Sequence, residues 1–133
     1  MDYNIKELIK KAFEGQKVSY APYSEFKVGA SLLCGSGKIY IGGNIENASY
    51  PAGICAERVV YSKAISEGEK QFIALCITSS NEEDYAFPCG VCREFVSEFD
   101  LNTKIIVAKN IDEYLVYELQ DLLPRSFNKN MLK

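Results

Sequence analysis

Two cysteines three residues apart, Cys89 and Cys92, stand in the segment FPCGVCRE at residues 87–94. Such a pair could form a redox centre, a disulfide or half of a metal site. The sequence contains no histidine, so Ser-His-Asp triads, Cys-His pairs and histidine-ligated metals are all excluded. Any metal chemistry must therefore rest on Cys, Asp and Glu side chains.

A third cysteine, Cys55, follows a loop and starts a segment with helical periodicity, as Cys89 does. Two helix N-termini would bring three thiols to one point, and their backbone N–H groups favour thiolates. Three protein ligands are typical of a catalytic zinc site, which keeps one position for water, whereas a structural site has four. The other two cysteines, Cys34 and Cys76, lie in apolar strand patterns, and we interpret them as small buried hydrophobic residues.

Glu57 lies two residues after Cys55, in the first turn of the same predicted helix. A favourable interaction with the helix dipole would by itself explain a glutamate at this position. Beside three thiolates, however, a carboxylate can relay a proton from zinc-bound water, whose pKa is lowered to about 7. These four residues together predict a catalytic zinc centre with water as the fourth ligand.

The composition predicts one soluble domain spanning residues 1–133. The chain is 47% hydrophobic and 25% charged, which is typical of a globular protein rather than a disordered one. Its formal net charge of −3 and scattered basic residues argue against nucleic acid and anionic membranes as partners. No apolar run suggests a membrane span or signal peptide, and an odd number of cysteines, 5, argues against a disulfide framework. We therefore expect a cytoplasmic protein.

Apolar spacing predicts the elements that position these residues. We expect helices at residues 5–13, 55–66 and 89–99, with Asp2 or Asn4 as the cap of the first and a short helical turn within residues 118–127. We expect strands at residues 27–34, 38–42, 72–78, 105–108 and 114–117. The first two form a hairpin across a Gly-Ser-Gly turn, and the link between the last two is short enough to favour an antiparallel return. This order predicts an α/β domain with a mixed sheet.

Three motifs resemble the cytidine deaminase family: CAER at residues 55–58, PCGVCR at 88–93 and NIENASY at 44–50. The likeness extends from APYSEFKVGA to ELQDLLPRSF, which is nearly the whole chain, and points to the small branch whose zinc ligands are all cysteines. It implies a three-layer α/β/α sandwich with a mixed five-stranded sheet, one Zn²⁺ per subunit and a homotetramer that works in pyrimidine salvage.

The resemblance also implies roles for individual residues. Cys55, Cys89 and Cys92 would ligate zinc, while Glu57 moves protons as zinc-bound hydroxide attacks C4 of cytidine or 2′-deoxycytidine. The positions that match nucleoside-binding ones are Phe26, Asn44, Glu46, Ala56 and Phe127, and the candidates to complete a neighbouring subunit's pocket are Tyr23, Ala48 and Tyr50. Residues two apart in an extended segment face the same side, so Asn44 and Glu46 can bind ribose hydroxyls together, and such a site disfavours free cytosine.

Charge gives Arg58 a predicted role beside the thiolates. Three thiolates on Zn²⁺ leave a net negative charge, which weakens the metal as a Lewis acid. Arg58 follows Cys55 by three residues and could hydrogen-bond its sulfur, the alternative being a solvent-facing side chain. For Arg93 the sequence allows either a similar role beside the thiolates or a surface position. Glu94 stands where the family usually has glutamine, and pairing with Arg58 would draw that cation away from the sulfurs.

Other functions remain open at the level of sequence. A blasticidin-S-type aminonucleoside deaminase shares the C-A-E and P-C-G-x-C-R motifs, although Asn44 and Glu46 favour an ordinary nucleoside. A non-catalytic zinc module would have no need of Glu57. A thiol redox protein would oxidise Cys89 and Cys92 reversibly without zinc.

Overall fold

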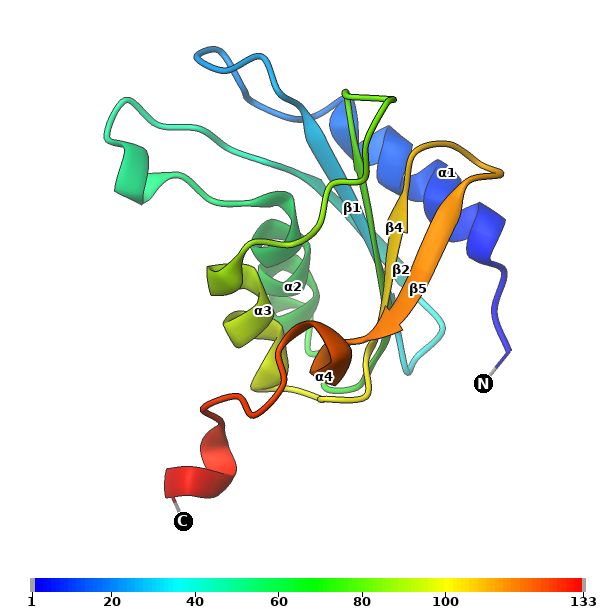
Figure 1. Ribbon diagram of the computed structural model, residues 1–133, viewed down its shortest axis with the longest axis vertical. Coiled ribbons are helices and arrows are strands. Elements are labelled where there is room, and N and C mark those ends of the chain that lie inside the picture. Colours follow the sequence, from blue (N-terminus) through cyan, green and yellow to red (C-terminus); the bar gives the residue numbers. More distant parts are fainter. Residues whose placement is uncertain (1, 133) are drawn as a thin grey trace.

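A mixed sheet with strand order β2-β1-β3-β4-β5 forms the centre of the computed structural model, which describes residues 2–132 (Figure 1). The strands are β1 Val28–Cys34, β2 Ile39–Gly43, β3 Phe72–Ser79, β4 Lys104–Ala108 and β5 Tyr114–Glu118. Strands β3 and β4 are parallel, while β1 pairs antiparallel with β2 and β3, and β4 with β5. The predicted mixed sheet, the hairpin and the antiparallel return are therefore confirmed.

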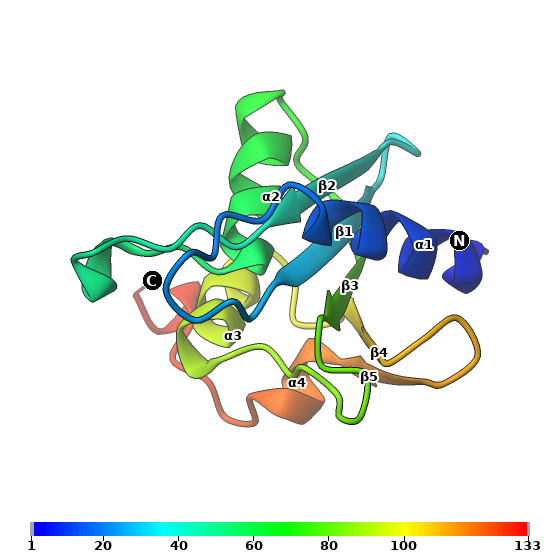
Figure 2. The same cartoon turned by 90° about the horizontal axis from the view of Figure 1, so that it is seen from above.

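Helices cover both faces of this sheet (Figure 2). The α-helices are α1 Ile5–Gln16, α2 Ala56–Ser66, α3 Gly90–Ser97 and α4 Leu119–Leu122, and the 3₁₀ turns are η1 Tyr50–Ala52 and η2 Lys129–Leu132. Leu8, Ile9 and Ala12 of α1 pack in one buried cluster, whereas Val60 of α2 and Val96 of α3 belong to another. The three-layer prediction is thus confirmed. Among residues 2–132, no helix is long and apolar enough to cross a membrane.

The two cysteines outside the motifs lie in these two clusters, as predicted. Cys34 packs in the cluster on the α2 side and Cys76 in the cluster on the α1 side, and both are fully buried. Burial raises the pKa of each thiol to about 12. Both side chains therefore remain neutral and serve as apolar packing groups.

Helix α1 packs very close to the sheet, which fixes the position of the segment that follows the helix. A Cβ atom at Gly29 would lie 1.9 Å from the backbone oxygen of Ala12, so only glycine permits this approach. The chain after α1 then runs beside the extension of β2. There Tyr20 N donates to Asn44 O at 2.8 Å, and Glu46 N donates to Tyr20 O at 2.8 Å.

The extension of β2 is held from its other side as well. Ile45 and Ile54 exchange two backbone hydrogen bonds of 2.9 and 2.8 Å, which close the long excursion between β2 and α2. Asn44 and Glu46 are therefore held in an extended segment between two neighbouring stretches of chain. This segment leads directly to the start of α2.

Candidate active site

Three thiols meet where α2 and α3 begin. Cys55 is the N-cap residue of α2, Cys89 is the N-cap residue of α3, and Cys92 lies in the first turn of α3. Neither N-cap side chain accepts a capping hydrogen bond from its helix. The positive ends of two helix dipoles therefore act on the sulfurs and favour their thiolate forms.

The sulfur positions fit a tetrahedral zinc ion. Cys55 Sγ lies 3.9 Å from Cys89 Sγ, which lies 3.6 Å from Cys92 Sγ, and all three atoms are within 4.8 Å of one another. Ligands about 2.3 Å from a tetrahedral zinc ion are separated by roughly 3.8 Å. All three thiols are free, so the set can hold a metal and leaves a fourth corner open.

Glu57 projects from the first turn of α2 into a buried environment. The residue is only 4% exposed, and its Oε1 atom has no hydrogen-bond partner among residues 2–132. Burial raises the pKa of the Glu57 carboxyl to about 7, and the negative charge at Cys55 adds to this effect. A carboxyl group with this pKa and a free oxygen is suited to exchanging protons with a bound ligand near neutral pH.

Arg58 lies beside the cluster, as predicted, with Nη2 3.7 Å from Cys55 Sγ. The thiol contact with Cys92 and the guanidinium of Arg58 lower the pKa of Cys55 to about 5. Among residues 2–132, no ion pair joins Arg58 to Glu94, whose carboxylate instead lies 3.5 Å from the Ser97 hydroxyl. The guanidinium is therefore available to the sulfurs, and the pairing considered for Glu94 is not found.

Arg58→Met is expected to lower any catalytic turnover of the zinc-loaded protein by about tenfold, because no cation would then offset the charge of the thiolates. The variant keeps most of the side-chain volume, and Arg58→Lys should recover part of the loss. Steady-state kinetics at matched zinc content measure the effect. Unchanged turnover of both variants would show that Arg58 serves only as a surface residue.

Arg93 has a role that neither sequence interpretation foresaw. Its Nε donates to Pro88 O at 2.8 Å, and its Nη1 donates to Leu122 O at 2.8 Å. The guanidinium thus ties the loop before Cys89 to the end of α4 and does not face the sulfurs. It fixes the position of one thiol through the backbone.

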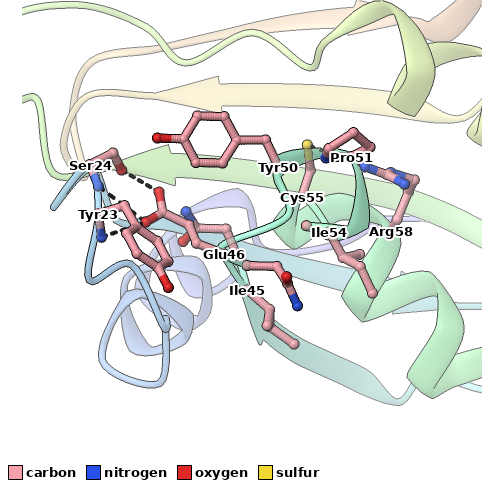
Figure 3. Close-up of a pocket in the computed structure, with 12 residues that line it drawn as sticks. Tyr23, Ser24, Ile45, Glu46, Tyr50, Pro51, Ile54, Cys55 and Arg58 are labelled. Carbon is pink, nitrogen blue, oxygen red and sulfur yellow. Dashed lines mark hydrogen bonds between the residues drawn. The ribbon is translucent and has the colours of Figure 1, made fainter.

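Two cavities adjoin the thiols. One, of about 570 Å³, is lined by residues that include Tyr23, Ser24, Asn44, Glu46, Tyr50, Cys55 and Arg58 (Figure 3). The other, of about 430 Å³, is lined by residues that include Phe26, Asn44, Cys55, Ala56, Glu57 and Cys89. Asn44 and Cys55 line both, so the two hollows share a wall at the thiol cluster.

The structure brings most of the predicted site residues to these cavities. Asn44, Glu46, Phe26 and Ala56 lie on their walls. The rings of Tyr23 and Tyr50 are both more than half exposed, with centroids 6.5 Å apart at the larger cavity. Phe127 and Ala48 are exposed and line neither cavity within one chain, so their predicted roles stay predictions.

Sequence reasoning missed two serines, Ser19 and Ser24, that contact the predicted sugar-binding pair. The Ser19 hydroxyl donates to Asn44 Oδ1, and the Ser24 hydroxyl donates to a carboxylate oxygen of Glu46. No periodicity or spacing marks them, because their partners lie more than 20 residues away. Their only signal was their place in or beside the motif APYSEFKVGA.

Comparison with known proteins bears directly on this arrangement. Residues 2–109 match the family model described as the cytidine and deoxycytidylate deaminase zinc-binding region. The chain belongs to the cytidine deaminase family. A probable cytidine deaminase of Dictyostelium discoideum is 38% identical over 96% of this chain and 86% of its own length. A cytidine deaminase of Sporosarcina psychrophila is 38% identical over 97% of this chain and 95% of its own length.

A solved structure of the cytidine deaminase family shares the fold. The crystal structure of cytidine deaminase from Burkholderia pseudomallei superposes with a TM-score of 0.88 at 34% sequence identity. The match covers 94% of this chain and all of the other. The chain is thus a member of this family of enzymes, and its three clustered thiols fit the zinc-binding region that the family model describes.

Proposed function

We propose that this protein hydrolyses cytidine and 2′-deoxycytidine to uridine and 2′-deoxyuridine with release of ammonia, in pyrimidine salvage. The observation that carries the proposal is the buried Glu57 carboxylate, whose free oxygen stands beside three clustered thiols. A non-catalytic zinc module would gain nothing from the desolvation cost of this group. A thiol redox pair would not need the third thiol of Cys55.

The metal and the carboxylate would have separate tasks. The thiolates of Cys55, Cys89 and Cys92 would hold the zinc ion, which when bound would supply a water molecule that ionises near neutral pH. Glu57 would accept one proton from the attacking water and deliver it to N3 of the cytosine ring as the C4–O bond forms. It would then accept the second proton, from the hydroxyl group now on C4, and pass it to the amine as the C4–N bond breaks, so that ammonia leaves and a C4 carbonyl remains. A single carboxyl group with a pKa near 7 can act as base and then as acid in this way.

The cavity walls supply contacts for the rest of the nucleoside. Phe26 offers an aromatic surface in the smaller cavity, where Ala56 presents its backbone near the thiols. Asn44 and Glu46 offer an amide and a carboxylate to the ribose hydroxyls. Because free cytosine would leave these polar groups unpaired, the enzyme is expected to discriminate strongly against the base alone.

The proposal extends to one zinc ion per subunit, a homotetramer and a cytoplasmic location. The candidates to complete a neighbouring subunit's pocket are Tyr23, Ala48 and Tyr50, and the two tyrosines are large exposed aromatic side chains that such an assembly would bury. The 5 free cysteines suit a reducing compartment. Sedimentation of the active enzyme measures the assembly, and a fully active monomer would contradict the tetramer.

The decisive experiment follows the ultraviolet absorbance of cytidine with purified, zinc-loaded protein. Conversion to uridine, with free cytosine turned over at least 1,000-fold less efficiently, is the expected result, since sites that hydrogen-bond a substrate hydroxyl reject analogues lacking it by about 10⁴-fold. Turnover of blasticidin S but not of cytidine would replace the proposal with the aminonucleoside alternative.

A further inference from the structure

The carboxylate of Glu46 is held in one orientation by the loop that follows Tyr20 (Figure 3). The backbone N–H groups of Tyr23 and Ser24 both donate to its Oε1, at 3.0 and 3.1 Å. The Ser24 hydroxyl donates to its Oε2. Two donors satisfy Oε1, whereas Oε2 keeps one lone-pair direction free. Glu46 is one of the residues that line the larger cavity.

The direction of the Ser24 hydroxyl hydrogen is itself fixed. Phe26 N donates to Ser24 Oγ at 3.0 Å, so this oxygen already acts as an acceptor and its hydrogen is left for Glu46. The loop is closed by Glu25 N, which donates to Ala21 O at 3.0 Å. Glu25 adopts φ 59°, a left-handed conformation that a non-glycine residue seldom takes. The turn at Glu25 is therefore locally strained, and this turn places two N–H groups and a hydroxyl within hydrogen-bonding distance of one carboxylate.

Asn44 is fixed in a similar way, but with the opposite polarity toward the cavity. Its Oδ1 accepts from the Ser19 hydroxyl and from Val28 N, the latter at 3.0 Å. Its Nδ2 donates one hydrogen to Phe26 O at 3.0 Å. The amide oxygen is therefore saturated, and what remains for a ligand is the second hydrogen of Nδ2.

Asn44 can consequently only donate to a ligand, and Glu46 can only accept from one. We propose that Ser19 and Ser24 are specificity-determining positioning residues, which fix this polarity so that the pocket selects a nucleoside whose sugar carries a free 2′ or 3′ hydroxyl. That hydroxyl accepts from Asn44 Nδ2 and donates to Glu46 Oε2. The inference rests on the proposed function, and it adds two residues that never touch the reacting atoms.

The test compares cytidine with 2′,3′-dideoxycytidine, which lacks the 2′ and 3′ hydroxyls and keeps the 5′ hydroxyl, in wild type and in Ser24→Ala. Loss of a hydrogen bond to a charged group is expected to reduce kcat/KM for cytidine by about tenfold, mainly through KM. The dideoxynucleoside should change by less than about twofold, because it never engages Glu46. Ser24→Thr, which keeps the hydroxyl, should restore most of the cytidine efficiency.

A matched control is available at the hairpin turn. The Ser36 hydroxyl donates to Glu69 Oε2 at 2.9 Å, so Ser36→Ala removes the same kind of contact away from the cavities. It should leave both substrates unchanged. Ser19→Ala should also reduce cytidine efficiency more than dideoxycytidine efficiency, but by less than Ser24→Ala does. It frees one lone pair of Asn44 Oδ1, while Val28 N and Phe26 O still hold the amide.

The inference would be overturned if Ser24→Ala left the ratio of kcat/KM for cytidine to kcat/KM for dideoxycytidine unchanged, whether both values fell equally or neither fell. Failure of wild type to deaminate cytidine would instead refute the proposed function. In that case, calorimetric titration with uridine and 2′,3′-dideoxyuridine still decides the inference. A preference for uridine in wild type that disappears in Ser24→Ala supports it, and a preference that persists contradicts it.

Discussion

Glu57→Gln is expected to lower kcat for cytidine by about a thousandfold while zinc content stays at the wild-type level. Glutamine has nearly the same shape as glutamate, so the thiols and cavity walls should keep their positions. The glutamine side chain cannot accept and release a proton at neutral pH. In wild type, Glu57 Oε1 is a buried carboxylate oxygen beside the thiols that has no hydrogen-bond partner among the described residues. The loss of cytidine absorbance measures kcat, and elemental analysis measures zinc.

A matched control separates this role from an ordinary helix-dipole interaction. Glu7 also lies in the first turn of a helix, α1, on the opposite face of the sheet. Glu7→Gln should leave kcat unchanged and lower the free energy of unfolding by less than about 1 kcal/mol. If Glu57→Gln behaved in the same way at full zinc content, Glu57 would be a dipole partner and the proton-transfer mechanism would be wrong.

Cys89→Ser should abolish zinc retention and reduce activity by more than about 100-fold, since even the outer partners of metal ligands contribute 10- to 100-fold. Cys89 is exposed, so the substitution should cost little packing energy. Any loss of function then reports the loss of a ligand rather than damage to the core. Zinc content after dialysis and kcat at saturating cytidine are the two measurements.

The buried thiol of Cys34 provides the comparison. Cys34→Ala removes a sulfur from the core cluster on the α2 side and should lower stability modestly while zinc content and kcat stay unchanged. Chelation followed by added zinc should restore wild type and Cys34→Ala but not Cys89→Ser. Full activity of metal-free wild type, dependent on the redox state of Cys89 and Cys92, would instead support a thiol redox protein.

Local patterns were enough to predict the elements of this fold. The apolar spacing of residues 5–13 and the continuous apolar run at 72–78 correspond to α1 and β3, with boundaries shifted by a few residues at most. Cys55 and Cys89 were expected at helix starts, and the structure makes both of them N-caps. Periodicity and capping act over a few residues, so the sequence displays them directly.

Contacts between distant segments were harder to predict. Arg93 reaches Leu122, 29 residues away, and its hydrogen bonds use backbone oxygens that leave no trace in side-chain patterns. Ser24 contacts Glu46 from a loop in which Glu25 adopts the left-handed conformation. A glycine at this position would have indicated the turn in the sequence, but a glutamate does not. Sequence therefore indicated which residues carry chemistry, while the groups that orient them emerged only from the tertiary arrangement.

Helices α2 and α3 lack side-chain capping hydrogen bonds at their N-termini, so the stability of their first turns depends on the thiol centre. Helix α1 starts at Asn4, whose side chain accepts a hydrogen bond from Glu7 N, and such a cap stabilises a helix by about 1 kcal/mol. The helices that begin at Cys55 and Cys89 have no such support. Their first turns should be the earliest part of the stripped protein to open and exchange amide hydrogens with solvent. Loss of the metal and fraying of these two turns would then be a single cooperative event.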